Sequence, residues 1–289
     1  MKINFNNSII ESYIWHKESF LIKRDDLISP FINGNKVYKF YFLLNRDFEI
    51  ITSYGGNQSN AMATLSYIAK VKNARFVYFT RELPTLLLNQ VSGNLKFALE
   101  NKMELKISND MKNDCIAFAN ENNAIFVPQG GAMNEAREGI AKLAQDIINL
   151  NLENLCVFYS SGTGTSSLFL QEYLKKYNID VFTTPCVGNK NYLYKQFLIL
   201  SKKKQNFPQI LQTKDKFTFA KPNIKLLNIY REFLKQGIEF DLLYDCVMWH
   251  AIIDNFHIIK NYKNRLFLHS GGIFGNKSQI ERYEYYNMF

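Results

Sequence analysis

The sequence has only four cysteines and four histidines, and neither set forms a pattern that holds a metal ion. The cysteines lie far apart with no CxxC spacing, and the histidines show no spacing of metal ligands. Cys115 and Cys156 lie in apolar stretches, which is typical of thiols buried as small hydrophobic groups. The sequence therefore predicts no metal site.

Long apolar runs are also missing. No stretch of 18 apolar residues occurs, and residues 1–7 lack the basic and apolar regions of a signal peptide. There is no repeat of fixed period, no linker rich in Pro or Gly, and no low-complexity segment. From these absences we expect a cytosolic protein without a membrane partner.

Acidic residues are outnumbered, because 35 Lys and Arg face 26 Asp and Glu and give a formal net charge of +9. A nucleic-acid-binding surface requires such charge to be concentrated on one face or in one run. The densest run, residues 202–204, lies at the end of an expected helix and is typical of a solvated surface. We expect no nucleic-acid partner, although the basic balance suits a small anionic substrate such as an amino acid.

Strand-like and helix-like stretches alternate along most of the chain. Strands are expected at residues 49–53, 74–80, 102–108, 124–128, 154–159, 180–184 and 265–269. Helices are expected at residues 37–44, 58–72, 85–100, 110–122, 135–150, 165–177, 189–204, 223–236 and 245–259. This alternation predicts an α/β fold with two open, mainly parallel twisted sheets and flanking helices.

The strand–helix units fall into two groups. Those between residues 46 and 145 are enough for a small open sheet, and those after residue 150 make a second sheet onto which the N-terminal segment folds. We therefore expect a large domain of residues 1–45 and 146–289, and a small domain of residues 46–145. Because no linker separates them, the two domains should share a cleft. Ligands of open α/β sheets bind beyond the carboxyl ends of the strands, where the Gly-rich turns of this chain fall.

Two of these turns place polar groups at the starts of expected helices. Gly34-Asn35-Lys36 puts a lysine just after a glycine turn, and residues 53–60 (SYGGNQSN) follow an apolar strand. Such turns leave backbone N–H groups free to bind an anion. A lysine in a turn of this kind is in most proteins a plain surface charge, so the motif alone decides nothing.

A third turn, residues 160–167 (SSGTGTSS), follows an expected strand and opens a helix. Its glycines, hydroxyls and N–H groups suit a phosphate. A phosphate-loop NTPase would need Gly-Lys-Ser/Thr, yet no lysine occurs before Lys175. A dinucleotide turn would need a glycine where Ser167 stands, and an acid at the end of the next strand, whereas Asp180 begins that strand. A single phosphate monoester fits best, and a helix cap without a ligand is the alternative.

Together, a turn lysine, a Gly-Gly-x-Gln-Ser-Asn turn and a phosphate-binding loop on α/β sheets indicate pyridoxal 5'-phosphate. This cofactor requires a lysine amine for its Schiff base, donors for its phosphate and a partner for its pyridine nitrogen. The three turns supply the first two requirements.

The ordered set of motifs resembles the family of 1-aminocyclopropane-1-carboxylate (ACC) deaminases and D-cysteine desulfhydrases, which have the tryptophan-synthase-β-like fold of pyridoxal phosphate enzymes (fold type II). The matching motifs span the whole chain and are residues 23–27 (KRDDL), 34–39 (GNKVYK), 55–60 (GGNQSN), 128–132 (PQGGA), 160–167, 241–245 (DLLYD) and 269–272 (HSGG). The resemblance implies that the cofactor lies in the cleft between the domains, with the small domain closing over the substrate. It also implies a homodimer.

The resemblance implies cofactor-binding roles for the matching residues. Lys36 would form the Schiff base and shuttle the substrate's proton. Asn60 would hydrogen-bond the cofactor's phenolic oxygen, Lys39 would help to neutralise its phosphate, and Asp245 would face its pyridine nitrogen. The phosphate itself would be held by Ser161, Gly162, Thr163, Gly164 and Thr165.

Three further roles concern the substrate. Ser59 would contact the substrate carboxylate and, in deaminase-like chemistry, lie close to the reacting carbon, with Gln58 binding the substrate beside it. Tyr244 would stand over the substrate as an acid or a nucleophile. Judged from the residues alone, Tyr244 also suits packing beside its leucine neighbours, and Asp245 suits a helix cap.

The chain departs from the family's pattern at three places. Glutamate follows the tyrosine in the deaminases and keeps the pyridine protonated, whereas desulfhydrase-like members tend to carry Thr or Ser. Asp245 is a carboxylate one methylene shorter, which favours the deaminase side. The second tyrosine of the deaminases is absent from residues 217–223, and Cys246-Val247 replaces the family's Gly-Lys.

From this pattern we expect a pyridoxal-phosphate-dependent deaminase that acts on a small amino acid and releases ammonia and a 2-oxo acid, which would be 2-oxobutanoate with ACC. One alternative is a desulfhydrase-like β-elimination lyase, which would release pyruvate and sulfide from D-cysteine. The other is a non-catalytic member that binds the cofactor or an amino acid as a sensor, motivated by the missing tyrosine and by Cys246-Val247.

Overall fold

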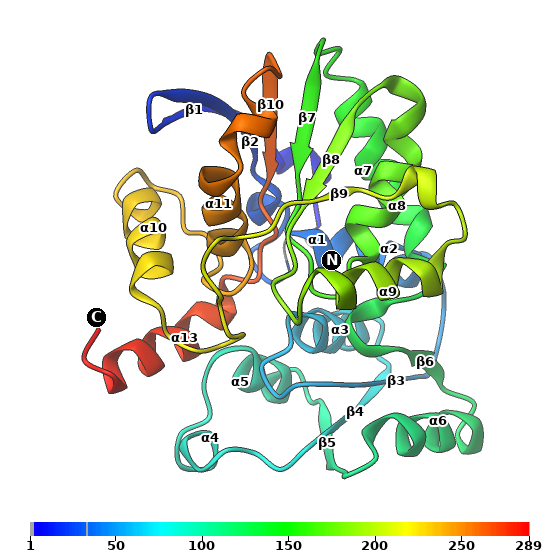
Figure 1. Ribbon diagram of the computed structural model, residues 1–289. Helices are drawn as coiled ribbons and strands as arrows, with labels where there is room; N and C mark the ends of the chain where they lie inside the picture. The colour runs from blue at the N-terminus through cyan, green and yellow to red at the C-terminus, as the bar shows by residue number, and fades with distance from the viewer. Residues whose placement is uncertain (1–2, 33, 289) are drawn as a thin grey trace.

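The computed structural model describes residues 3–32 and 34–288, which form a mixed α/β structure with two sheets (Figure 1). The first sheet has the strand order β1 (Ile10–Trp15), β2 (Glu18–Lys23), β10 (Asn264–Leu268), β7 (Leu155–Phe158), β8 (Asp180–Thr183) and β9 (Gln209–Ile210). The second has the order β5 (Glu104–Ile107), β4 (Arg75–Thr80), β3 (Ile50–Tyr54) and β6 (Ile125–Val127). Within the described ranges no helix is both long and apolar enough to cross a membrane.

Every strand pairing in the two sheets is parallel except that of β1 with β2. Figure 1 shows the six-stranded sheet in the upper part of the molecule and the four-stranded sheet in the lower part. Parallel strands end at the same edge of their sheet, so the loops that follow β2, β10, β7 and β8 lie side by side. The predicted α/β fold with two mainly parallel sheets and flanking helices is confirmed.

The helices cover the sheets, and several of them begin directly after the loops that follow the strands. In chain order they are α1 (Asn35–Lys39), α2 (Tyr41–Leu44), α3 (Asn60–Val71), α4 (Thr85–Asn89), α5 (Gly93–Glu100), α6 (Met111–Glu121), α7 (Ala136–Ile148), α8 (Thr165–Leu174), α9 (Lys190–Leu200), α10 (Ile224–Leu234), α11 (Asp245–Asp254), α12 (Phe256–Ile259) and α13 (Phe274–Tyr285).

Three expected helices are interrupted. The helix expected at 85–100 ends with α4 and resumes as α5, because Gly93 has a φ of +58° and Ser92 is held by Glu281 through a 2.6 Å hydrogen bond. The helix expected at 37–44 breaks at Phe40, whose φ and ψ are −102° and 16°. The helix expected at 245–259 breaks between α11 and α12. In each case packing or a long-range contact overrides the local helical periodicity.

Four elements were missing from the prediction: β1, β2, β9 and α13. The β1–β2 hairpin turns at His16 and Lys17, whose φ values of 48° and 67° are both positive, as a two-residue turn of this kind requires. Neither residue is the Asn or Gly that normally marks such a turn. The sequence therefore carried no turn signal there.

Aromatic packing fixes α11 against β10. Trp249 of α11 stacks on Phe267 of β10 with ring centroids 4.3 Å apart and an angle of 4° between the planes. Trp15, Phe20 and Phe233 surround the same indole, and all of these side chains are at most 2% exposed. This packing sets the start of α11 beside the loop that follows β10.

Two glycines let backbone segments approach closely around α1. A Cβ at Gly34, just before α1, would lie 2.0 Å from the Ser270 carbonyl oxygen. A Cβ at Gly139 of α7 would lie 1.8 Å from the Tyr38 carbonyl oxygen. Helix α1 is thus held between the loop after β10 and α7, with Lys36 on it.

We expect Gly139→Ala to destabilise the protein by about 1–3 kcal/mol, because the new methyl group would push α7 and α1 apart. Urea unfolding measures the change. Glu138→Ala, at the exposed neighbouring position on α7, is the control and should leave stability nearly unchanged. An unaltered unfolding midpoint for Gly139→Ala would show that α1 and α7 are not in this close contact.

Candidate active site

A cavity of about 350 Å³ lies where the loops of the two sheets meet. Its wall is built from the start of α1, the turn before α3, the loop before α8, the start of α11, the loop after β10 and the C-terminal half of α13. Ten of the residues singled out from the sequence lie on this wall: Lys36, Lys39, Gln58, Ser59, Asn60, Ser161, Gly162, Thr163, Gly164 and Tyr244. Thr165 and Asp245 are fully buried behind it.

Lys36 is set in place by backbone contacts at the start of α1. The Asn35 N–H donates to the Ser270 carbonyl (3.1 Å), and the Gly34 N–H donates to the Asp25 carbonyl (2.8 Å). The Lys36 Nζ donates to Asn35 Oδ1 at 2.6 Å and forms no ion pair with a carboxylate among the described residues. Burial lowers the pKa of Lys36 to about 8, against the opposing effect of two buried carboxylates, Asp241 and Asp245. This amine is therefore deprotonated more readily than an ordinary lysine, and roughly a tenth of it is uncharged at pH 7.

Lys39 is the second amine on the same wall. Lys39 is buried, with 4% of the residue exposed, and its Nζ donates to the Gly130 carbonyl at 3.0 Å. Burial, together with the neighbouring charge of Lys36, lowers the pKa of Lys39 well below its ordinary value. In the part of the chain that the structure describes, no Asp or Glu lines the cavity. Because a buried cation is stable only with a counter-charge, this wall fits an anionic group.

The loop before α8 supplies donors for such a group. Ser161 Oγ is tied to Thr183 Oγ1 (2.6 Å) and Ser167 Oγ (2.8 Å), which fixes the loop against β8. Gly164 has a φ of +71°, and a Cβ there would come within 2.5 Å of Phe197 and Leu193. The backbone N–H groups of residues 162–164 have no hydrogen-bond partner among the described residues. Two lysines of the wall, free N–H groups and the N-terminus of α8 together fit the phosphate of pyridoxal phosphate.

The turn before α3 is held from outside the cavity. Ser59 Oγ caps α3 by accepting from the Met62 N–H at 3.3 Å. The Gln58 side chain is tied to the segment before α5, since it accepts from the Asn94 N–H (2.9 Å) and donates to the Ser92 carbonyl (3.0 Å). No sequence pattern indicated that Gln58 would hold two segments together.

Asn60 is oriented at both ends of its amide. Its Oδ1 accepts from Asn94 Nδ2 at 2.6 Å, and its side chain hydrogen-bonds the Asp241 carboxylate. Gly272 is needed beside it, because a Cβ there would lie 2.2 Å from the Asn60 amide nitrogen. One N–H of the amide remains to bind a ligand.

Asp241 is a buried carboxylate whose part in the site was not predicted, although it begins the motif 241–245. Its Oδ1 accepts from the N–H groups of Leu243 (2.8 Å) and Tyr244 (2.7 Å), so it shapes the start of α11. Burial raises the pKa of Asp241 to about 7, while these hydrogen bonds oppose the rise.

Tyr244 stands on the wall with its ring against the Gly162 backbone, where a Cβ would lie 3.3 Å from Cε1. Burial raises the pKa of Tyr244 well above its ordinary value, with Asp241 adding to the effect. The phenol is therefore protonated at neutral pH. Phe219 packs edge-on against this ring at 5.8 Å, in the stretch where the deaminases carry their second tyrosine.

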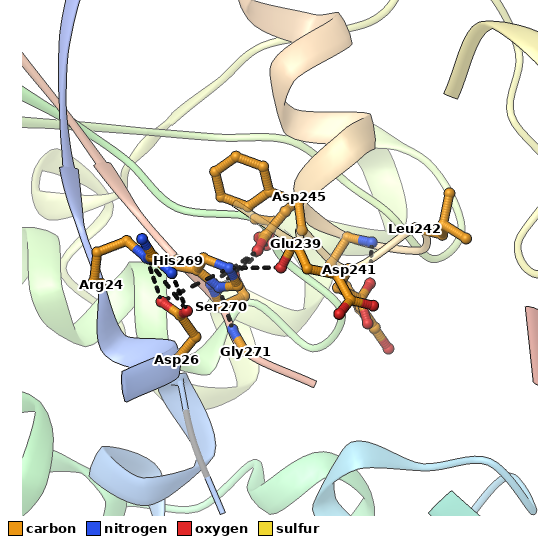
Figure 2. Close-up of polar contacts among 12 residues, drawn as sticks. Arg24, Asp26, Glu239, Asp241, Leu242, Asp245, His269, Ser270 and Gly271 are labelled. Atoms are coloured by element: carbon orange, nitrogen blue, oxygen red, sulfur yellow. Dashed lines mark hydrogen bonds and ion pairs between the residues drawn. The ribbon is translucent and has the colours of Figure 1, made fainter. Parts of the chain in front are cut away.

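Asp245 lies at the centre of a buried polar network (Figure 2). Its Oδ1 accepts from Ser160 Oγ (3.2 Å), and its Oδ2 accepts from the Ser270 N–H (3.0 Å). The two serine hydroxyls contact each other at 2.7 Å, and both serines line the cavity, whereas Asp245 does not. Burial and the charge of Asp241 raise the pKa of Asp245 well above its ordinary value. The sequence predicts that Asp245 faces the pyridine nitrogen. In the structure Ser160 and Ser270 lie between the Asp245 carboxyl and the cavity.

His269 lies behind Asp245 and was not singled out beyond its motif. Its Nδ1 accepts from the Gly271 N–H (3.0 Å), and its Nε2 lies 2.9 Å from the Glu239 carbonyl, so Nε2 carries the proton. Burial lowers the pKa of His269, which agrees with a neutral ring. Figure 2 shows the imidazole between Asp245 and Asp26, and Asp26 is held by two nitrogens of Arg24.

No family model matches the chain. It is 23% identical, over 90% of its length and 91% of the relative, to a protein of Thermotoga maritima described as "Putative 1-aminocyclopropane-1-carboxylate deaminase". Its structure superposes on that of an ACC deaminase homologue with a TM-score of 0.75 at 19% identity, covering 91% of this chain and 89% of the other. The fold is that of the type II pyridoxal phosphate enzymes.

More distant structures share this fold. A threonine deaminase from T.th. matches with a TM-score of 0.66 at 12% identity, covering 88% of this chain and 87% of the other. The diaminopropionate ammonia lyase of Escherichia coli matches with a TM-score of 0.66 at 11% identity, covering 96% and 86%. The resemblance read from the motifs, to the ACC deaminase family within this type II fold, is confirmed.

The buried Asp241 makes stability depend on pH. An unfolded Asp titrates near 3.8 and the folded one at about 7, so stability from the neutral carboxyl is present below pH 3.8 and is lost as pH rises through about 7. This rise in the pKa of Asp241 corresponds to at most roughly 4 kcal/mol of unfolding free energy. We therefore expect Asp241→Asn to flatten the fall in unfolding free energy between pH 4.5 and pH 8.

Urea unfolding of the cofactor-free protein at the two pH values measures this effect. Asp47→Asn, at an exposed position, is the matched control and should keep the wild-type pH dependence. If Asp241→Asn and wild type lose the same free energy between the two pH values, the carboxyl is not titrating in this range.

Proposed function

We propose that the protein is a pyridoxal-phosphate-dependent enzyme that acts on a small amino acid and releases ammonia and a 2-oxo acid. The observation that carries this proposal is the pair of amines, the half-buried Lys36 and the buried Lys39, on a cavity wall that no carboxylate of the described residues lines. Pyridoxal phosphate, when bound, supplies an aldehyde for an amine and a ring that stabilises negative charge at the substrate's α-carbon.

The protein's own groups divide the remaining work. Lys39 and the N–H groups of residues 162–164 hold the phosphate, and the free N–H of Asn60 binds the phenolic oxygen. Ser59, at the N-terminus of α3, binds the substrate carboxylate together with Gln58 through the turn's backbone. The Lys36 amine, kept partly neutral by burial, takes a proton from a carbon of the substrate or returns one, and with ACC, whose α-carbon carries no hydrogen, that carbon is a ring methylene. The protonated Tyr244 phenol gives a proton to the group that leaves or to the carbon that accepts one.

ACC-deaminase-like chemistry is the favoured reaction, supported by the identity to the Thermotoga protein along nearly the whole chain. β-Elimination of the desulfhydrase kind is the second candidate, and a separate observation favours it. The hydroxyls of Ser160 and Ser270 line the cavity in front of Asp245, and a hydroxyl beside the pyridine nitrogen suits the loss of a good leaving group. Residues 217–223 contain no tyrosine, which points the same way, whereas Tyr192 places a second phenol on the cavity wall from another segment.

A non-catalytic role is less favoured than either reaction. It was motivated in part by Cys246-Val247, but neither residue lines the cavity, and Cys246 is fully buried in α11. We propose that residues 46–145, which carry the four-stranded sheet, close over the substrate held by the rest of the chain. A homodimer and a cytosolic location remain predictions.

The decisive assay incubates cofactor-loaded protein with ACC, D-cysteine and other small amino acids of both configurations and measures ammonia, 2-oxo acid and sulfide. We expect turnover of at least one of them, and a loss of about 10³-fold or more in Lys36→Ala, because the other amine of the wall, Lys39, is held at the Gly130 carbonyl. Lys112→Ala, which removes an exposed amine, is the control.

The products separate the candidate functions. 2-Oxobutanoate from ACC supports the deaminase, whereas sulfide from D-cysteine with no attack on ACC replaces it by the lyase. Loaded protein that turns over none of the panel is a binding protein, and the proposed enzymatic function is then wrong.

A further inference from the structure

Helix α13 brings two polar side chains to the cavity that the proposed chemistry does not use. Gln279 and Arg282 are three residues apart, so they share one face of the helix, and both line the wall. Arg282 Nη1 donates to the Ala220 carbonyl at 3.0 Å, and no carboxylate among the described residues pairs with the guanidinium. A guanidinium has five N–H donors, so most of them remain available.

Gln279 is the second observation. The residue is 3% exposed, and its side-chain amide has no hydrogen-bond partner in the part of the chain that the structure describes. Gln279 lines the cavity and its amide is not sealed in the core, so the amide is free to bind a ligand there. An amide and a guanidinium left free side by side, on the wall of a substrate-sized cavity, fit the oxygen atoms of a ligand.

The charges of the wall indicate what kind of ligand this is. Its cations are Lys36, Lys39 and Arg282, and no Asp or Glu of the described residues lines the wall with them. In the proposed function, Lys36 is occupied by the cofactor and Lys39 by its phosphate, while the α-carboxylate of the substrate lies at Ser59. Arg282 then remains for a second anionic group, and its planar fork suits two oxygens of one group.

We propose that Arg282, assisted by Gln279, selects amino acids whose side chain ends in an anionic oxygen group, either a carboxylate or a phosphate ester. The inference rests on the proposed function, because it places the side chain of that function's substrate. ACC and D-cysteine carry no second carboxylate or phosphate, so they report the type of reaction, whereas the anionic side chain sets which amino acid the site prefers.

Arg282 also has a structural contact that the test must separate. Its hydrogen bond holds Ala220, a non-glycine residue with a φ of +60°, at the cavity wall. Loss of that contact would alter the wall for every substrate alike. Loss of an anion-binding group would affect only the charged member of a pair of amino acids of equal size.

Isothermal titration calorimetry with matched pairs makes this separation. The pairs are aspartate with asparagine, glutamate with glutamine, and O-phosphoserine with serine, each as L and D forms, titrated into cofactor-loaded protein. In wild type we expect the charged member of at least one pair to bind about tenfold or more tightly, an advantage that shrinks in high salt. Arg282→Met should abolish the advantage, and Arg282→Lys should keep part of it.

Lys277→Met is the matched control, since it removes an exposed cation from the same helix and should leave the preference unchanged. The inference is overturned if wild type binds both members of every pair equally, or if Arg282→Met lowers both affinities and leaves their ratio intact. If Arg282→Met does not fold, Arg282→Lys and the salt dependence decide. The same titrations on cofactor-free protein measure the preference for the charged amino acid even if Lys36 binds no cofactor. Failure of the proposed function is then seen separately, as absence of cofactor uptake.

Discussion

The structure depends on one electrostatic constraint: two amines, the half-buried Lys36 and the buried Lys39, lie on a cavity wall that no carboxylate of the described residues lines. Lys36 and Lys39 lie three residues apart on α1, and the charge of Lys36 makes a second charge on Lys39 unfavourable. Burial without a counter-charge is unfavourable unless the amines are neutral or an anion joins them. Close approaches of the backbone at Gly34 and Gly139 hold α1, which carries both amines, against the loop after β10 and against α7. The site is therefore prepared for an anionic ligand at a fixed position.

A buried polar framework supports this wall from behind. Asp241 orients Asn60 and the start of α11, and Asp245 holds Ser160 and Ser270, with His269 completing the contact to Asp26. These groups satisfy one another and are mostly screened from the cavity. Their effect on chemistry is to fix which hydroxyls and amides face the ligand, and they achieve it through positions rather than through direct contact.

Much of the fold and of the cavity wall could be predicted from the sequence because local residue patterns indicate them. The strand–helix alternation predicted the α/β fold, and the glycine turns predicted most residues of the wall, since a loop after a parallel strand opens at a known edge of the sheet. The hairpin at His16–Lys17 escaped because neither residue normally marks a turn, and the break at Gly93 escaped because a long-range contact between Ser92 and Glu281 accompanies it. Such contacts leave no periodic signal.

In the site, too, features that depend on long-range contacts could not be predicted from the sequence. Asp245 was recognised by its motif, but whether its short side chain reaches the cavity depends on Ser160 and Ser270, which follow two other strands. Gln279 and Arg282 lie on a polar helix near the end of the chain, and only its docking against the loops brings them to the wall. A motif predicts which residues are present, whereas the partners that modify them come from tertiary packing.

Borohydride reduction followed by peptide mass spectrometry tests the central claim most directly. Protein incubated with pyridoxal phosphate should turn yellow, and reduction should fix the phosphopyridoxyl group on the peptide that contains Lys36, with Lys36→Ala remaining unlabelled. Labelling of Lys39 in its place, or of exposed lysines only, would contradict the account, as would protein that stays colourless in the presence of the cofactor.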